Sequence, residues 1–274
     1  METFFIKVNG YKIRCAARGK GPHLVLIHGL GGSLEWWRFN FNYLSHKYHV
    51  IAFDFLGFGY SAKPQIEFSL DLASNFMRSF LESLKLRSVS LIGNSLGGLI
   101  ALYTASELGQ RIERLILVDN AGFGRELSFL LRLGTLYPLG EITFYLRHFI
   151  ITKLFLSRLF YDRQKLPAEL VSCVLKMFES PLARKVCLRI LRRGVNLGGL
   201  KKDILDPIME RASLLNQPTL IIWGRNDRII PVVQAYRGKN LIKNSKLVVF
   251  DKCGHLPQVE KWPEVNQIIL KFLG

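Results

Sequence analysis

Short runs of consecutive apolar residues recur along the chain, and most are bounded by Gly or Asp. Runs without polar alternation suit strands that are buried on both faces, so they predict a mostly parallel sheet. The predicted strands are His23–Ile27, His49–Phe53, Val89–Ile92, Arg114–Val118, Thr219–Trp223 and Lys246–Phe250.

Longer segments with helical spacing separate these runs. In Leu70 to Leu84 the apolar residues recur every three or four positions, which places them on one face of a helix. A predicted hairpin at the start of the chain turns at Asn9-Gly10, and a predicted helix over 263–272 ends it. Alternation of strand and helix predicts an α/β fold with helices on both faces of the sheet.

This alternation stops near Gly122 and resumes near Gln217. The residues between are rich in Leu, Phe and Arg, have helical spacing and carry no strand signal. We interpret residues 123–212 as a helical cap inserted into a core made of residues 1–122 and 213–274.

Composition agrees with a folded chain, since 49% of the residues are apolar and 22% are charged. Neither a secretory signal nor an apolar run long enough to cross a membrane is visible, and the four Cys show no paired spacing. We therefore expect a cytoplasmic protein with free thiols. The net charge of +17 brings nucleic acid, anionic membrane and anionic substrates into consideration.

The strongest motif is Gly93-Asn94-Ser95-Leu96-Gly97, between a predicted strand and a predicted helix. A sharp strand-to-helix turn of this kind presents a nucleophilic serine, and the flanking glycines avoid clashes in the tight turn. Serine needs a base to take its proton. Of the six histidines, His255 alone lies in a loop just after the last predicted strand, where open α/β sheets place their sites.

A third residue should orient the imidazole of His255. Asp227 follows the predicted strand Thr219–Trp223, and Asp119 follows Arg114–Val118, so both reach the same edge of the sheet. We favour Asp227 and keep Asp119 as its competitor. The remaining histidines, His23, His28, His46, His49 and His148, are interpreted as structural.

An acyl-transfer site also needs backbone donors for the oxyanion. The glycine-rich loop after His23–Ile27 would lie beside Ser95, which makes the N–H groups of Leu30 and Leu96 the predicted donors. Residues predicted to contact the substrate are Gly29, Asn94 and Trp36. We expect no metal and no organic cofactor.

Five motifs together resemble the α/β-hydrolase superfamily, in its branch of capped esterases, lipases and carbon–carbon bond hydrolases. They are His28-Gly-Leu-Gly-Gly-Ser33, Asp54-Phe-Leu-Gly-Phe-Gly-Tyr-Ser61, Gly93-Asn-Ser-Leu-Gly-Gly98, Trp223-Gly-Arg-Asn-Asp227 and Gly254-His255. The order Ser95, Asp227, His255 is the order of that family. The resemblance implies an α/β-hydrolase fold and a structural turn at Asp54. Related dehalogenases and epoxide hydrolases use an aspartate nucleophile, and Ser95 argues against both.

The first part of the predicted cap, residues 127–160, is rich in large apolar side chains, among them Phe129, Leu130, Tyr137, Phe149 and Phe160. They form either the packing of the cap on the core or a pocket for an acyl or aromatic substrate, and both interpretations stay open. The predicted activity is cleavage of apolar carboxylic esters. The alternatives are hydrolysis of a carbon–carbon bond in a vinylogous diketone and a ligand receptor on the same fold.

The second part of the predicted cap is basic, with seven Lys and Arg and no acid between Glu179 and Asp203. Its helical spacing separates an apolar face from a basic one, which is typical of helices that lie on anionic membranes. A solvated outer face of the cap is the favoured interpretation of this pattern. We keep peripheral membrane contact through this helix as a hypothesis. No nucleic-acid recognition motif accompanies the charge, so we expect no nucleic-acid partner.

Overall fold

The computed structural model describes residues 1–145, 153 and 156–274. His148 and Phe149 lie outside the described residues. Within the described part, eight strands form one sheet in the order β1-β2-β4-β3-β5-β6-β9-β10. Its strands are β1 Phe4–Val8, β2 Tyr11–Arg18, β3 His23–Ile27, β4 His49–Phe53, β5 Val89–Asn94, β6 Ile112–Val118, β9 Thr219–Gly224 and β10 Ser245–Phe250.

Strands β4, β3, β5, β6, β9 and β10 run parallel, while β2 pairs antiparallel with both β1 and β4. The prediction of a mostly parallel sheet is therefore confirmed. The β1–β2 hairpin turns at Asn9 and Gly10, whose φ angles are +49° and +80° as the Asn-Gly signal predicts.

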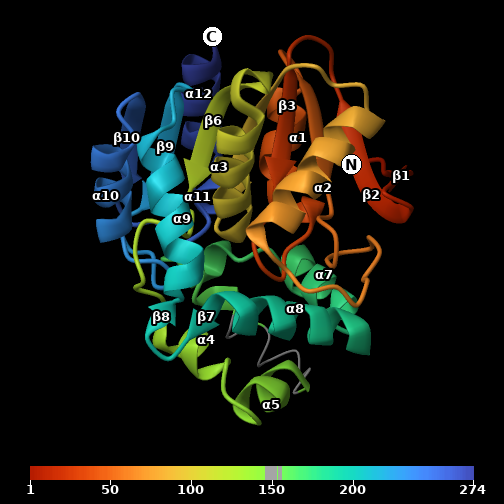
Figure 1. The fold of residues 1–274 in the computed structure, drawn as a ribbon, viewed down its shortest axis with the longest axis vertical. Helices are drawn as coiled ribbons and strands as arrows, with labels where there is room; N and C mark the ends of the chain where they lie inside the picture. Colours follow the sequence, from red (N-terminus) through yellow and green to blue (C-terminus); the bar gives the residue numbers. More distant parts are fainter. Residues whose placement is uncertain (146–152, 154–155) are drawn as a thin grey trace.

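Side chains of the central strands alternate between two cores, one on each face of the sheet. On β3, Val25 and Ile27 belong to one core, and Leu24 and Leu26 belong to the other. Helices α2 (Leu70–Ser83) and α3 (Leu96–Leu108) cover the first core, and α1 (Arg38–Leu44) and α12 (Trp262–Leu273) cover the second. Because helices cover both faces of the sheet (Figure 1), the central strands appear in the sequence as continuous apolar runs.

The segment between β6 and β9 adds no strand to this sheet in its described residues. Its helices are α4 (Phe129–Leu133), α5 (Leu139–Tyr145), α7 (Ala168–Met177), α8 (Pro181–Gly194) and α9 (Lys202–Ser213). Helices α4, α5, α7 and α8 lie beyond one end of the strands, with α5 farthest from the sheet (Figure 1). A strand pair, β7 (Val195–Asn196) and β8 (Gly199–Leu200), was not predicted, because two residues are too few to show a period.

Helix α9 packs against the sheet domain. Arg211 of α9 forms an ion pair of 2.9 Å with Glu107 of α3, and its guanidinium lies 4.4 Å from the ring centroid of Tyr103. The division into a core and a cap stays a prediction, and its boundary at 212 falls one residue before the end of α9. After β9 the chain continues through α10 (Val233–Leu241), β10 and α11 (Pro257–Glu260).

Candidate active site

Ser95 occupies the sharp turn between β5 and α3, in a left-handed conformation with φ of +56° and ψ of −120°. A side chain on Gly93 would overlap the backbone of Gly97, and one on Gly97 would overlap the carbonyl oxygen of Ile27. The motif is therefore glycine-flanked because β3, β5 and α3 approach one another at this turn.

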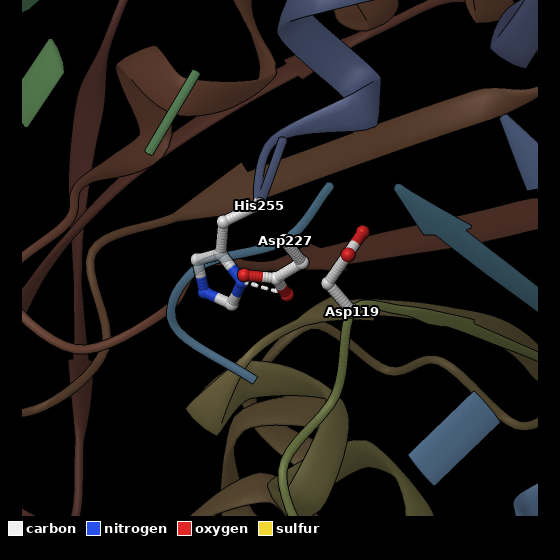
Figure 2. Close-up of side chains that lie close together, drawn as sticks. All are labelled: Asp119, Asp227 and His255. Carbon is white, nitrogen blue, oxygen red and sulfur yellow. Dashed lines mark hydrogen bonds and ion pairs between the residues drawn. The ribbon is translucent and has the colours of Figure 1, made fainter. Parts of the chain in front are cut away.

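His255 and Asp227 form a buried hydrogen-bonded pair (Figure 2). The His255 Nδ1 and Asp227 Oδ2 atoms are 2.7 Å apart. The other oxygen of Asp227, Oδ1, accepts hydrogen bonds from the backbone N–H groups of Ile229 at 2.7 Å and Ile230 at 3.1 Å. These bonds fix the carboxylate, which in turn fixes the orientation of the imidazole ring.

Asp119 lies beside this pair but makes no hydrogen bond to His255 (Figure 2). It is fully buried, and its Oδ1 accepts the N–H of Gly224 at 3.0 Å. Burial and the neighbouring charge of Asp227 both raise the pKa of Asp119 well above its ordinary value. The structure thus pairs Asp227, the residue favoured from the sequence, with His255.

These three side chains also form the one group in the described residues that could approach a metal ion, with ligand atoms within 4.8 Å of one another. A cation there would compete with the hydrogen bond that Nδ1 of His255 and Oδ2 of Asp227 already share. The donor set therefore fits an oriented imidazole better than a metal centre.

A cavity of about 230 Å³ opens onto Ser95 and His255, which both contribute to its wall. Gly29, Leu30, Leu96 and Trp36 line the same cavity, as expected for substrate contacts and oxyanion donors. The loop after β3 comes so close to Ser95 that a Cβ on Gly29 would lie 2.9 Å from the Cβ of the serine.

Two backbone N–H groups near Ser95 are available to an oxyanion. Leu30 donates no hydrogen bond to any described residue. Leu96 is the first residue of α3, where N–H groups have no partner within the helix. The positions of Leu30 and Leu96 are thus compatible with the predicted role.

Asn94 is not among the residues that line the cavity, and its role as a substrate contact stays a prediction. The residue is fully buried, and its Nδ2 donates to the carbonyl oxygens of Val118 at 3.1 Å and His255 at 3.3 Å. These hydrogen bonds support the backbone that carries His255.

Glu260 is a buried residue of this region that the sequence analysis missed. Its carboxylate accepts the N–H groups of Gly254 at 2.8 Å, Tyr161 at 3.1 Å and Asp162 at 2.8 Å. The N–H of His255 also donates to the oxygen of Leu159 at 2.7 Å. The His255 loop is thus tied to residues 159–162 of the helical segment. No short motif marks such a contact, because its partners are backbone groups far away in sequence.

His28 and Asp54 have structural roles, as expected. The Nε2 atom of His28 accepts the N–H of Phe55 at 3.0 Å, and burial lowers the pKa of the imidazole. Asp54 accepts the N–H groups of Leu34 and Tyr60, each at 2.8 Å, which closes its turn.

Helix α8 turns its apolar face inward. Cys187, Ile190 and Leu191 line the cavity, so this face cannot enter a membrane while the cavity stays closed. Two of its cations are paired, Arg192 with Glu141 at 2.6 Å and Arg193 with Asp203 at 2.6 Å. Membrane contact through this helix stays a prediction, limited to its polar face. In the described residues, no helix has the length and apolarity needed to cross a bilayer.

Comparison with known proteins relates this geometry to a family. A family model described as alpha/beta hydrolase fold matches residues 22–261. The chain is 31% identical over 265 residues to the 2-hydroxy-6-oxo-2,4-heptadienoate hydrolase of Pseudomonas putida, which covers 93% of this chain and 90% of that protein.

Two solved structures share the fold over nearly the whole chain. A meta-cleavage product hydrolase from Pseudomonas fluorescens has a TM-score of 0.84 and 25% identity, over 98% of this chain and 97% of its own. A membrane phospholipase A, described as a bacterial virulence factor, has a TM-score of 0.82 and 26% identity, over 99% of this chain and 85% of its own. The sequence motifs, the fold and these similarities agree, and the chain belongs to the α/β-hydrolase family.

Proposed function

We propose that this protein is a serine hydrolase that cleaves carboxylic esters with an apolar acyl or aromatic group. The observation that carries the proposal is the chemistry of the cavity wall. Among the described residues, no Asp, Glu, Lys or Arg lines the cavity that opens onto Ser95 and His255. Apolar side chains surround it, including Phe68, Leu99 and Phe178. Such a wall favours a substrate that is uncharged near the reacting carbon.

The proposed reaction uses Ser95 as nucleophile and His255 as base. Oγ of Ser95 attacks the ester carbonyl and gives its proton to Nε2 of His255, while Asp227 stabilises the imidazolium through Nδ1. The N–H groups of Leu30 and Leu96 bind the oxyanion of the tetrahedral intermediate. The imidazolium then protonates the leaving alcohol, and an acyl-enzyme remains. Water, activated by His255, attacks this ester, and Ser95 recovers its proton when the acid leaves. All catalytic groups belong to this chain.

Hydrolysis of a carbon–carbon bond is the second candidate, and the similarity to a 2-hydroxy-6-oxo-2,4-heptadienoate hydrolase favours it. A dienoate substrate carries a carboxylate, which in an apolar site needs a basic partner. The described part of the cavity wall offers no Lys or Arg for this carboxylate. The similarity to a membrane phospholipase A supports the ester proposal, because phospholipases A cleave carboxylic esters. For this reason we place ester hydrolysis first.

Trapping the acyl-enzyme tests the proposal. The protein is mixed with a p-nitrophenyl ester, quenched in acid within the first turnovers and measured by intact-protein mass spectrometry. We expect the mass of the acyl group to be added to the native protein, on the peptide that contains Ser95, and to be absent from Ser95→Ala. Turnover of 2-hydroxy-6-oxo-hepta-2,4-dienoate is measured in parallel. Faster turnover of the dienoate than of any ester, without an acyl adduct, would overturn the ester proposal. Tight binding without any turnover would favour a receptor.

A further inference from the structure

Large apolar side chains gather on the surface formed by α4, α5 and the turn between β7 and β8. We call them the α4–α5 patch: Phe129, Leu130, Tyr137, Leu139, Ile142 and Leu197. Tyr137 is 81% exposed, Phe129 is 61% exposed and Leu197 is 51% exposed. These elements lie together at the end of the molecule that is farthest from the sheet (Figure 1). An apolar surface of this kind marks a site of interaction with another molecule or a membrane.

Contacts within the patch hold its three parts together. The Arg132 guanidinium donates to the carbonyl oxygen of Leu197 at 3.1 Å and lies 5.6 Å from the ring centroid of Phe129. Arg192 of α8 bonds both the carbonyl oxygen of Thr135, at 3.0 Å, and the carboxylate of Glu141 on α5. The exposed side chains are therefore fixed on one structured surface.

The patch is continuous with the cavity. Leu130 is 43% exposed on the surface and also lines the cavity that opens onto Ser95. Leu131 and Gly134 of the same segment line it as well, and so does Thr143 of α5. The same segment thus contributes to both the exposed patch and the apolar cavity wall.

The charges around the patch identify its occupant. Three acidic residues in or next to these elements in the sequence are paired with arginines: Glu126 with Arg237 at 2.7 Å, Glu141 with Arg192 and Asp203 with Arg193. By contrast, Arg132, Lys201 and Lys202 form no ion pair with any described residue. An apolar surface with unneutralised cations fits the acyl region and the anionic headgroups of a lipid bilayer.

We propose that the α4–α5 patch docks this protein onto the surface of a bilayer that contains anionic lipid, with Phe129 and Tyr137 inserted below the headgroups. Docking would bring the cavity close to the lipid phase. Only the catalytic use of this position rests on the proposed ester hydrolysis. The surface differs from the polar face of α8 considered from the sequence. The apolar contribution comes from α4 and α5, because the apolar side of α8 already lines the cavity.

Vesicle binding tests the docking surface apart from catalysis. Full-length Ser95→Ala protein is sedimented with vesicles of phosphatidylcholine alone and with vesicles that also contain phosphatidylglycerol. The test variant adds Phe129→Ser and Tyr137→Ser, two residues that do not line the cavity. The control variant adds Leu214→Ser and Tyr236→Ser, which are also exposed but lie on or next to α9 and α10. Thermal unfolding of each variant shows that it is folded.

We expect partitioning onto the anionic vesicles to fall by about tenfold or more in the test variant and to change by less than about twofold in the control. Partitioning of the parent Ser95→Ala protein should also fall when salt is raised to about 1 M, because the electrostatic screening length shrinks to about 3 Å. Absence of binding to anionic vesicles, equal binding to neutral ones, or equal loss in both variants would overturn the proposal. So would a self-associating protein that becomes monomeric in the test variant, because the occupant would then be a second copy. Hydrolysis of a short soluble ester is measured separately, with protein that retains Ser95. Failure of the ester proposal can therefore be distinguished from failure of the docking proposal.

Discussion

Two aspartates, Asp119 and Asp227, reach the same place from neighbouring strands, and they form different sets of hydrogen bonds. Asp227 accepts two backbone N–H groups and bonds His255, which suits a carboxylate. Asp119 accepts one backbone N–H, and its Oδ2 atom is buried without a hydrogen-bond partner among the described residues. Burial and the neighbouring charge of Asp227 therefore raise the pKa of Asp119 well above its ordinary value.

The raised pKa of Asp119 makes the stability of the protein depend on pH. A raised carboxyl pKa means that the folded protein holds a proton that the unfolded chain releases above its ordinary pKa of about 3.9. The free energy of unfolding should therefore decrease as the pH rises from that value toward the raised pKa. Asp119→Asn, which is neutral at every pH, should remove this part of the decrease.

Urea unfolding of the native protein and Asp119→Asn between pH 4 and pH 8 measures the difference. We expect the two proteins to differ least at the acid end, with Asp119→Asn becoming relatively more stable as the pH rises. If the free energies of unfolding of the two proteins changed in parallel with pH, this would contradict a raised pKa for Asp119. Asp206→Asn serves as a control, since it replaces an exposed aspartate on α9.

At the scale of one residue, the sequence could predict chemistry tied to a local motif. Ser95 and its glycines were predictable because the turn is defined by neighbours in the chain, and His255 because it follows the last strand. The choice between Asp119 and Asp227 depended on which carboxyl reaches Nδ1, a distance that no local pattern contains. The hydrogen bonds of Asn94 were not predictable for a similar reason, since their acceptors are the carbonyl oxygens of Val118 and His255, which are distant in sequence.

At the scale of elements, Glu260 of α11 joins the His255 loop to residues 159–162 of the helical segment. Glu260→Gln keeps the shape but replaces an acceptor oxygen by an N–H₂ group that faces backbone donors. We expect the free energy of unfolding to fall by about 1–3 kcal/mol, because a buried donor loses its partner. Ester kcat/KM should fall with it, because the His255 backbone is less fixed.

Denaturant unfolding and steady-state kinetics of Glu260→Gln check this prediction. The matched control is Glu264→Gln, an exposed residue in the first turn of α12. Unchanged stability and unchanged kcat/KM in Glu260→Gln would show that the contact does not support the His255 loop.

Helix α8 shows what amphipathic spacing can and cannot predict. The spacing correctly separated an apolar face from a basic one, but it could not say what covers the apolar face. In the structure that face lines the cavity through Cys187, Ile190 and Leu191. The alternation of strands and helices and the layered arrangement were predictable for the opposite reason, because strand and helix periods report burial directly.

The position of Ile190 leads to a prediction about substrate length. Ile190→Phe adds volume at the cavity wall, so the acyl chain that gives the highest ester kcat/KM should become shorter. Lys185→Phe places the same side chain on the exposed side of α8 and should leave the optimum unchanged. Kinetics over a series of p-nitrophenyl esters measures both. An optimum that is the same in Ile190→Phe and the native protein would place the acyl chain elsewhere.

At the scale of the whole molecule, the sheet brings together groups that are far apart in sequence. Ser95 follows β5, Asp227 follows β9 and His255 follows β10, and all three turns open at one edge of the sheet. The helical segment closes an apolar cavity over this edge, and its outermost surface carries the α4–α5 patch. The net charge of +17 could not be assigned to any partner from composition alone. The charge can be related to a partner only where the structure shows which cations remain unpaired beside an apolar surface.

The central claim is that Ser95 hydrolyses esters whose acyl group fills the apolar cavity. The most direct measurement is kcat/KM for p-nitrophenyl esters of increasing acyl length, with native protein and Ser95→Ala side by side. We predict that kcat/KM of the native protein rises from the acetyl ester to a longer optimum and that Ser95→Ala is inactive throughout. A native protein that hydrolyses no ester, or an activity that survives in Ser95→Ala, would contradict the claim.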